Sequence, residues 1–418
     1  MSISAILDTY SEEYWDFRNI KNSGIHSIAN YPAPMVASMQ HELLQILVKE
    51  NPKYKNLLDP FHGAGITLVE GQSLGLEVWG IDINPYAHII TFAKLEGCDS
   101  RVFEAAIERI TKLILQAQSE HNVKTHEFCN IDKWFREDVI VDLSIVRSSI
   151  LAEPEIRIRR YFWLCFGEIV KKYSNTRTST FKLHSKETQK IWDMTNNAIP
   201  EFLDKIQKTY VLIGSPTHTP YHLACGDATE FMKGYDEESF DIICTSPPYG
   251  DNATTVTYGQ FSVLQLLWID GNDFEYDIGC TDFFSKIDSM SLGGASSTRN
   301  PYYLSPILTS YLEHIASDKK AKVVRFYADY ENSFRQMARL LKHGGTMMLT
   351  LGNRRVDGVE FPFIKINKDL AEHYGLMITH VLSRNIMNKR MPFRVSRLSD
   401  GKPVNSMSKE TVLLFVKD

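Results

Sequence analysis

The sequence predicts an α/β protein in which short buried strands alternate with helices. Three observations predict this: an apolar run that ends in two prolines at residues 240–249, a turn with an acid and two glycines at residues 57–67, and an apolar run that ends in an acid at residues 76–82. Each run has the length of a buried strand, and each ends in residues that favour a turn. Residues 57–82 read as one strand–helix–strand unit, so we expect the ends of the three strands to line one pocket.

The run Thr-Ser-Pro-Pro-Tyr at residues 245–249 ends the first of these strands. Proline fixes φ and has no amide hydrogen, so the backbone here is stiff and leaves regular pairing. The strand end presents the Ser246 hydroxyl, the Pro247 carbonyl and the Tyr249 ring. These groups can stack on a planar ring and accept hydrogen bonds from an exocyclic amino group. The alternative is a proline turn after a core strand, with a tyrosine lid.

The turn at residues 57–67 has Asp59 ahead of Gly63 and Gly65, and a helical pattern follows. Glycines let the backbone approach a ligand closely, and a helix N-terminus offers free N–H groups. Leu68 occupies the third glycine position of the dinucleotide fingerprint, and no Gly-Lys-Ser/Thr follows, so neither that fingerprint nor a Walker A loop is present. The acid would repel a pyrophosphate but suits a ligand with an ammonium group. The alternative is an ordinary strand-to-helix turn.

The run at residues 76–82 ends in Asp82. An acid at the end of the second strand of a βαβ unit is well placed to bind ribose hydroxyls. The alternative is a surface acid that caps the helix beginning near Pro85.

Taken in this order, the motifs resemble the amino-group DNA methyltransferases, which use S-adenosylmethionine (AdoMet). Residues 59–65 resemble the AdoMet loop, and residues 245–249 resemble the catalytic motif. A serine before Pro-Pro-Tyr, here Ser246, is typical of enzymes that methylate the N4 of cytosine, whereas adenine-N6 enzymes more often carry aspartate. The resemblance covers roughly residues 20–98 and 221–418. It implies a Rossmann-like AdoMet methyltransferase fold, with a mixed, mostly parallel seven-stranded sheet and a helical insertion.

Four further segments are similar to parts of that family. Residues 31–35 open an amphipathic helix that resembles the segment packing on the methionine end of AdoMet, and residues 225–228 resemble the strand end whose acid contacts the adenine. Residues 341–351 and 410–416 look like a late strand and the closing strand. The resemblance implies a cofactor-binding set of Tyr31, Pro32, Asp59, Phe61, Gly63, Gly65, Thr67, Asp82, Ile83, Asp227 and Thr245, and a catalytic set of Ser246, Pro247, Pro248 and Tyr249.

The resemblance also implies direct methyl transfer without a metal. The target base must leave the duplex to reach the cofactor. Tyr249 would stack on the base, and Ser246 with the Pro247 carbonyl would hold its amino group. For the cofactor, Asp59, Asp82 and Asp227 would contact the methionine ammonium, the ribose and the adenine amino group respectively.

Composition sets broad limits. The 418 residues, of which 43% are hydrophobic, can bury a large core and suggest two parts. Neither a membrane-spanning run nor a signal peptide is evident, so we expect a cytoplasmic protein. The six cysteines form no Cys-x-x-Cys pair and are expected to be reduced. Cys244 precedes the catalytic run, and methylation of a ring carbon would require a thiolate nucleophile. Because Cys244 belongs to an apolar strand, we expect its thiol to be inert and its role to be structural.

The net charge of −5 excludes a uniformly basic nucleic-acid binder, so DNA contacts must come from local patches. Two basic patches stand out, and the stronger one, at residues 384–402, is expected to be a loop along the DNA phosphates. A second patch at residues 155–186 is weaker, because an apolar aromatic run at residues 161–166 interrupts it; the alternative for either patch is a solvated face. The stronger patch contains Arg384, Lys389, Arg390, Arg394, Arg397 and Lys402.

We expect five regions along the chain. Residues 1–98 are the cofactor-binding half, residues 99–220 a helical insertion, and residues 221–270 the catalytic half. Residues 271–340 are a loop-rich candidate recognition region with a flexible glycine- and serine-rich run at residues 291–297, and residues 341–418 hold the closing strands and the basic loop. The region that reads DNA is residues 271–340, residues 99–220 or both, and we favour a role shared by both.

Three functions remain open at this point. The first is a DNA cytosine-N4 methyltransferase acting on double-stranded DNA, with a cognate restriction endonuclease as partner. The second is an adenine-N6 or RNA-base methyltransferase on the same scaffold. The third is a catalytically silent module that binds nucleic acid or a partner, which the intact runs at residues 59–65 and 245–249 argue against.

Overall fold

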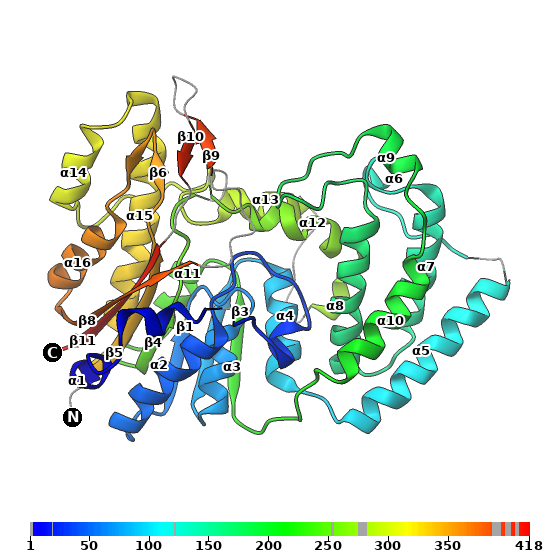
Figure 1. The fold of residues 1–418 in the computed structure, drawn as a ribbon, viewed down its shortest axis with the longest axis horizontal. Helices are drawn as coiled ribbons and strands as arrows, with labels where there is room; N and C mark the ends of the chain where they lie inside the picture. Colours follow the sequence, from blue (N-terminus) through cyan, green and yellow to red (C-terminus); the bar gives the residue numbers. More distant parts are fainter. Residues whose placement is uncertain are drawn as a thin grey trace.

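The computed structural model describes residues 3–18, 20–120, 123–251, 255–274, 282–386, 394–397, 403–405 and 409–418. A seven-stranded sheet covered by helices forms one lobe, and a helical lobe lies beside it (Figure 1). The strand order is β3-β2-β1-β4-β5-β11-β8, and β11 runs antiparallel to both of its neighbours while the other pairs are parallel. The predicted mixed, mostly parallel seven-stranded sheet is therefore confirmed. The strands are β1 Asn56–Asp59, β2 Glu77–Asp82, β3 Tyr221–Cys225, β4 Phe240–Thr245, β5 Leu341–Gly352, β8 Leu376–Asn385 and β11 Lys409–Lys417.

The centre of the sheet explains where a ligand can bind. Leu57 pairs with Ile242 and Leu58 with Ile243, so β1 and β4 are neighbours although 180 residues of chain separate the end of β1 from the start of β4. On its other side β1 pairs with β2. The strand order therefore reverses at β1, and the crevice outside the carboxyl ends of β1 and β4 is where open α/β sheets bind ligands.

Both faces of the sheet are buried, which explains the continuous apolar runs in its strands. Leu57 and Ile242 pack in a cluster with α2, whereas Leu58 and Ile243 pack in a cluster with α11, α15 and α16. Successive side chains of a strand point to opposite faces, so each strand contributes to both clusters. The covering helices include α2 Ala37–Glu50, α3 Ile66–Ser73, α4 Pro85–Glu96, α11 Ala228–Lys233, α14 Pro306–Leu312, α15 Ser317–Leu340 and α16 Phe363–His373.

The helical lobe is formed by α5 to α10, with α12 and α13 between it and the sheet lobe in Figure 1. The aromatic run at residues 161–166 lies in α8 and is fully buried, as expected for a core helix. Near residue 194 the helices are interrupted, because α9 ends at Trp192 and α10 starts at Ala198. These helices are α5 Ser100–Glu120, α6 Ile131–Trp134, α7 Glu137–Leu151, α8 Ile156–Tyr173, α9 Thr188–Trp192, α10 Ala198–Tyr210, α12 Tyr258–Trp268 and α13 Asp282–Met290.

Residues 271–340 differ from the loop-rich region that we expected. They include α15, the longest helix of the described chain at 24 residues. The run at residues 291–297 is a loop, but its first four residues are buried and the Gly293 amide donates to the Asp329 carboxylate of α15 at 2.7 Å. A buried carboxylate requires donors, and this requirement ties the loop to the helix instead of leaving it free.

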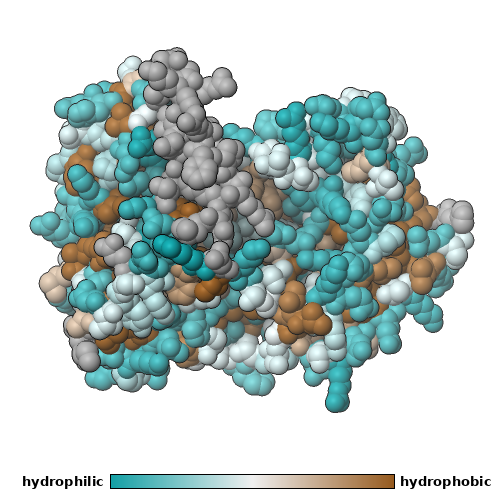
Figure 2. Space-filling view, viewed as in Figure 1, coloured by the Kyte–Doolittle hydropathy of each residue, from teal (hydrophilic) through white to brown (hydrophobic). Residues whose placement is uncertain are grey.

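The remaining elements are short. No helix in the described ranges combines the length and the apolar character that crossing a membrane requires. The face shown in Figure 2 is mostly hydrophilic, with hydrophobic side chains in small separate groups. The short elements are α1 Ile3–Leu7, η1 Glu12–Asp16, η2 Gly24–Ser27, η3 Gly271–Asp273, β6 Arg355–Val356, β7 Val359–Glu360, β9 Arg394–Arg397 and β10 Pro403–Asn405.

Candidate active site

The glycine turn after β1 is fastened to the end of β2 by Asp82. The Gly63 amide donates to one carboxylate oxygen of Asp82 at 2.9 Å, and the Asn84 amide donates to the other at 2.8 Å. Each oxygen has a second lone pair, so Asp82 can still accept hydrogen bonds from ligand hydroxyls. Gly63 and Gly65 both have left-handed backbone angles, with φ of 49° and 72°. The two glycines are therefore required by the shape of the turn.

Gly65 also allows the turn to pack closely on α4. A Cβ atom at Gly65 would lie 2.6 Å from the Thr91 hydroxyl. Beneath the same turn, the buried Lys94 ammonium donates to the Ala64 carbonyl at 2.7 Å. Burial lowers the pKa of Lys94 to about 7. The turn is thus held on one side by α4.

We expect Gly65→Ala to destabilise the protein more than Gly75→Ala. Both glycines have positive φ, which costs other residues about 1–2 kcal/mol. An alanine at position 65 would also clash with its neighbours, and overpacking of this kind costs about 1–3 kcal/mol more. An alanine at position 75 would not, because nothing lies within 4 Å of a Cβ there. Urea unfolding of the two variants measures the difference in free energy of unfolding. Equal losses would show that the turn yields to the added methyl group.

Asp59, at the carboxyl end of β1, has an unsatisfied buried oxygen. The residue is 0% exposed, its Oδ1 accepts the Phe61 amide at 3.1 Å, and its Oδ2 has no hydrogen-bond partner. Burial raises the pKa of Asp59 to about 7, and the hydroxyls of Thr245 and Thr67 nearby oppose that shift without reaching hydrogen-bond geometry to Oδ2. The buried Thr245 hydroxyl also lacks a partner. Buried polar atoms are seldom left unpaired, so this pair marks a place for a ligand with a donor group, such as an ammonium.

The predicted catalytic run follows directly from β4. Every residue of β4 is buried, and after Thr245 the chain leaves the sheet. The Ser246 and Tyr249 hydroxyls lie 3.1 Å apart, and both residues are half-buried, whereas Pro247 is buried and Pro248 half-buried. Burial raises the pKa of Tyr249 well above its usual value, so its phenol stays neutral. The run therefore presents two neutral hydroxyls and an aromatic ring at the carboxyl end of β4, the strand that neighbours β1.

Cys244 lies one residue before Thr245 but is not accessible. It is 1% exposed, and burial raises the pKa of its thiol well above the usual value. A thiol in this state is a poor nucleophile. The geometry agrees with a structural cysteine. Cys280 lies outside the described residues.

The chain just after the catalytic run is held by an arginine from the end of β5. Arg354 pairs with the buried Asp251 at 3.1 Å, and its guanidinium lies 5.3 Å from the Phe326 ring centre. A Cβ at Gly250 would come within 2.2 Å of the same guanidinium. Sequence spacing did not indicate this contact, because Arg354 and Gly250 are about a hundred residues apart.

Tyr31 lies over the glycine turn. A Cβ at Gly63 would be 3.5 Å from the Tyr31 ring, and the Tyr31 hydroxyl accepts from the Asn84 amide group at 3.1 Å. The Tyr258 ring stacks on Tyr31 with centres 5.6 Å apart. Tyr258 was missed from the sequence, where no motif contains it. Of the other predicted residues, Pro32 and Thr67 are buried, Phe61 and Ile83 are half-buried, and α2 begins at Ala37, two residues after Met35.

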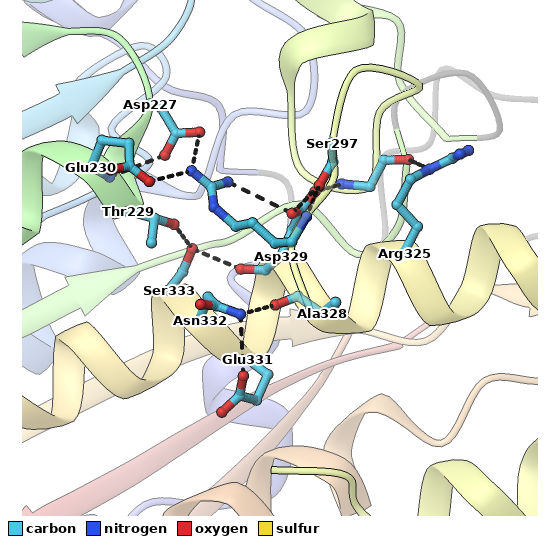
Figure 3. A network of polar contacts seen from close by, with 12 residues as sticks. Asp227, Thr229, Glu230, Ser297, Arg325, Ala328, Asp329, Glu331, Asn332 and Ser333 are labelled. Carbon is cyan, nitrogen blue, oxygen red and sulfur yellow. Dashed lines mark hydrogen bonds and ion pairs between the residues drawn. The ribbon is translucent and has the colours of Figure 1, made fainter. Parts of the chain in front are cut away.

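Asp227 caps α11 and is already engaged by the protein. Its Oδ1 accepts the Glu230 amide at 3.2 Å, and its Oδ2 accepts from the Arg299 guanidinium at 2.8 Å (Figure 3). Asp227 remains about a third exposed. Arg299 comes from the loop between α13 and α14 and was not predicted to contact this site.

The prediction that Arg384 lies on an exposed phosphate-binding loop is wrong. Arg384 belongs to β8, is 8% exposed, and pairs with Glu410 of the neighbouring strand β11 at 3.3 Å. Glu410 in turn lies beside Tyr249, and burial raises the pKa of Glu410. The strand continues past the point where the sequence suggested a loop, because Arg384 pairs across the sheet. Its charge is therefore used inside the protein, behind the catalytic run.

The other members of that patch are described only in part. Lys389, Arg390 and Lys402 lie outside the described residues. Arg394 and Arg397 belong to β9, which pairs with β10 in a two-stranded ribbon, and their side chains lie outside the description. Their role in DNA binding stays a prediction.

Part of the second basic patch is engaged in ion pairs within the chain. Arg160 is 1% exposed, and burial lowers the pKa of Lys171 to about 8. Cations that are paired internally are not available for phosphates. These pairs are Arg159 with Asp273, Arg160 with Glu96, and Lys172 with Glu201.

The strand order, the glycine turn after β1 and the acids at the ends of β1, β2 and β3 are those of the Rossmann-like methyltransferase fold. The chain is 29% identical over 429 residues to the type II methyltransferase M.MvaI from Kocuria varians, which covers 97% of this chain and 92% of that protein. It is 22% identical over 275 residues to the type II methyltransferase M.BsoBI from Geobacillus stearothermophilus, covering 58% of this chain and 52% of that protein.

Two other comparisons say less. No family model matches the sequence. Among solved structures, the rRNA methyltransferase aviRa from Streptomyces viridochromogenes aligns with a TM-score of 0.31 at 10% identity, covering 96% of this chain and 92% of that chain. A TM-score of this size supports neither a fold assignment nor a function.

Proposed function

We propose that the protein is an AdoMet-dependent DNA methyltransferase that methylates the N4 amino group of cytosine flipped out of double-stranded DNA. The observation that carries this proposal is the unpartnered buried oxygen of Asp59, placed at the strand end next to the hydroxyl pair of Ser246 and Tyr249. One end of the pocket thus suits an ammonium and the other a base with an amino group. The similarity to M.MvaI over nearly the whole chain supports the same class of reaction.

The residues of the pocket fit AdoMet. The Asp59 Oδ2 atom would accept the methionine ammonium, Asp82 the ribose hydroxyls, and Asp227 the adenine amino group. Tyr31 would cover the ligand above the glycine turn at Gly63. When bound, AdoMet supplies a methyl group on a positively charged sulfur.

The chain's own groups would hold the target base. Tyr249 stacks on the flipped base, and Ser246 with the Pro247 carbonyl accepts the hydrogen bonds of its amino group. This leaves the nitrogen lone pair directed at the methyl carbon, an alignment that supplies a large part of the rate gain. The amino nitrogen would gain the methyl group as the methyl–sulfur bond breaks and S-adenosylhomocysteine leaves, and one proton of the nitrogen would then pass to solvent. Because the Cys244 thiol is buried and neutral, the pocket offers no nucleophile there for attack on a ring carbon.

Cytosine is preferred to adenine because Ser246 occupies the position where adenine-N6 enzymes more often carry aspartate. Adenine-N6 methylation of DNA, or methylation of an RNA base, is the second candidate on the same geometry. The similarity to two type II methyltransferases favours a role in a restriction-modification system, with a cognate restriction endonuclease as partner.

The decisive assay incubates the purified protein with isotope-labelled AdoMet and mixed duplex DNA and RNA, and then identifies methylated nucleosides by mass spectrometry. We expect N4-methylcytosine in DNA. N6-methyladenine or a methylated RNA nucleoside would overturn the cytosine assignment. If no product forms and calorimetry detects no AdoMet binding, the protein is not a methyltransferase.

A further inference from the structure

Arg299 lies at the centre of a charge cluster that no motif predicted. One guanidinium nitrogen contacts Asp227 at 2.8 Å and Glu230 at 2.8 Å, and the other lies 3.6 Å from the buried Asp329 (Figure 3). Glu230 also pairs with Lys233 at 2.8 Å, whereas Arg299 is the cation that contacts all three carboxylates. Without Arg299 the acids would repel one another more strongly, since like charges in a partly buried cluster are screened weakly.

The loop that carries Arg299 is also anchored by contacts that do not involve the Arg299 side chain. Its Gly293 amide and Ser297 hydroxyl both donate to Asp329 of α15, and Arg325 donates from α15 to the Gly293 carbonyl at 3.2 Å. A Cβ at Gly293 would lie 2.7 Å from Phe326, so the loop approaches the helix as closely as glycine permits. Arg299 is therefore presented to Asp227 from a fixed base.

The Asp227 carboxylate is held on two sides. Glu230, in the first turn of α11, gives its amide to Oδ1, and Arg299 gives its guanidinium to Oδ2. Hydrogen bonds to an ionised group are stronger than neutral ones and restrict its orientation. Each oxygen keeps a free lone pair, so the carboxylate can accept one more donor in a defined direction.

We propose that Arg299 is a positioning residue for the adenine end of AdoMet, acting through Asp227. This inference rests on the proposed function, in which Asp227 accepts the adenine amino group. Arg299 sets the plane of the Asp227 carboxylate and, together with Lys233, pairs with Glu230 beside it. It also joins the loop after α13, part of the predicted recognition region, to the cofactor pocket.

The first test measures AdoMet affinity by calorimetry for Arg299→Ala, Arg299→Lys and Arg325→Ala. We expect Arg299→Ala to weaken AdoMet binding about tenfold, because Asp227, the proposed acceptor for the adenine amino group, loses a charged hydrogen-bond partner. Arg299→Lys keeps the charge and should recover part of the affinity. Arg325→Ala is the matched control: Arg325 holds the same loop but does not touch Asp227, so its affinity should stay close to that of the unchanged protein.

The second test separates positioning from general loosening. S-adenosylhomocysteine carries the 6-amino group that would donate to Asp227, whereas S-inosylhomocysteine has a carbonyl oxygen in its place. The ratio of the two affinities therefore measures the contribution of the contact with Asp227. We expect this ratio to fall about tenfold in Arg299→Ala and to stay unchanged in Arg325→Ala. Thermal unfolding checks that each variant is folded, and Arg299→Lys carries the test if Arg299→Ala is not.

Two results would overturn the inference alone. Both ligands could weaken equally in Arg299→Ala, or Arg325→Ala could lower affinity as much as Arg299→Ala does. By contrast, failure of the unchanged protein to bind AdoMet or S-adenosylhomocysteine would overturn the proposed function, and this inference with it.

Discussion

Replacing Tyr249 with alanine will lower kcat about a hundredfold while leaving the affinity for AdoMet within about threefold of its original value. Stacking of a base on an aromatic ring contributes about 1–3 kcal/mol, and a misplaced target loses about a further tenfold or more through poor alignment. The proposed AdoMet contacts come from Asp59, Asp82 and Asp227, whereas the Tyr249 hydroxyl bonds to Ser246. Steady-state methylation of duplex DNA and calorimetry with AdoMet measure the two quantities.

Tyr249→Phe is the matched variant. It keeps the ring and removes only the hydroxyl that lies 3.1 Å from Ser246. We expect a loss of about fivefold to tenfold, the size of one neutral hydrogen bond. Equal losses in the two variants would show that the hydroxyl, and not stacking, is the important group. An unchanged kcat in Tyr249→Ala would remove Tyr249 from the catalytic site.

AdoMet will bind about tenfold more tightly at pH 7 than at pH 5.5. The ammonium of the ligand pairs with the ionised form of Asp59, and each pH unit below the pKa of Asp59 lowers the ionised fraction by up to about tenfold. Burial raises the pKa of Asp59 to about 7, so most of this carboxyl is protonated at pH 5.5. Asp59→Asn should bind weakly at both pH values and lose the dependence. Calorimetry across this pH range is the measurement, and a pH-independent affinity in the unchanged protein would contradict the assignment.

The raised pKa of Asp59 also predicts how the free energy of unfolding of the ligand-free protein depends on pH. The folded-state pKa of Asp59 is raised above its unfolded value of about 3.9. The unfolded chain therefore releases this proton first, and the contribution of Asp59 to stability falls as the pH rises from about 4 to about 7. Asp59→Asn should remove this decline, so the variant gains stability relative to the unchanged protein at pH 7. Urea unfolding at pH 5 and pH 7 tests the sign.

The arrangement of the pocket was predictable to the extent that it follows from strand ends. Asp59, Asp82 and Ser246 each come directly after an apolar run, and parallel neighbouring strands bring such residues to one edge. Arg384 was misplaced for a related reason. Its local sequence is basic and precedes a proline, which favours a loop, whereas pairing of β8 with β11 continues the strand and buries the guanidinium against Glu410.

The sequence by itself determined the alternation of strands and helices along the chain near the site and the chemical type of the groups at the strand ends. Those features depend on short-range patterns: the period of apolar residues, the glycines of one turn and the prolines of another. Only the tertiary structure decided that Arg299 holds Asp227, that Tyr258 stacks on Tyr31 and that Arg354 packs against Gly250. These contacts join residues far apart in the chain, and they form because buried charges and rings must find partners wherever the packed helices and strands place them.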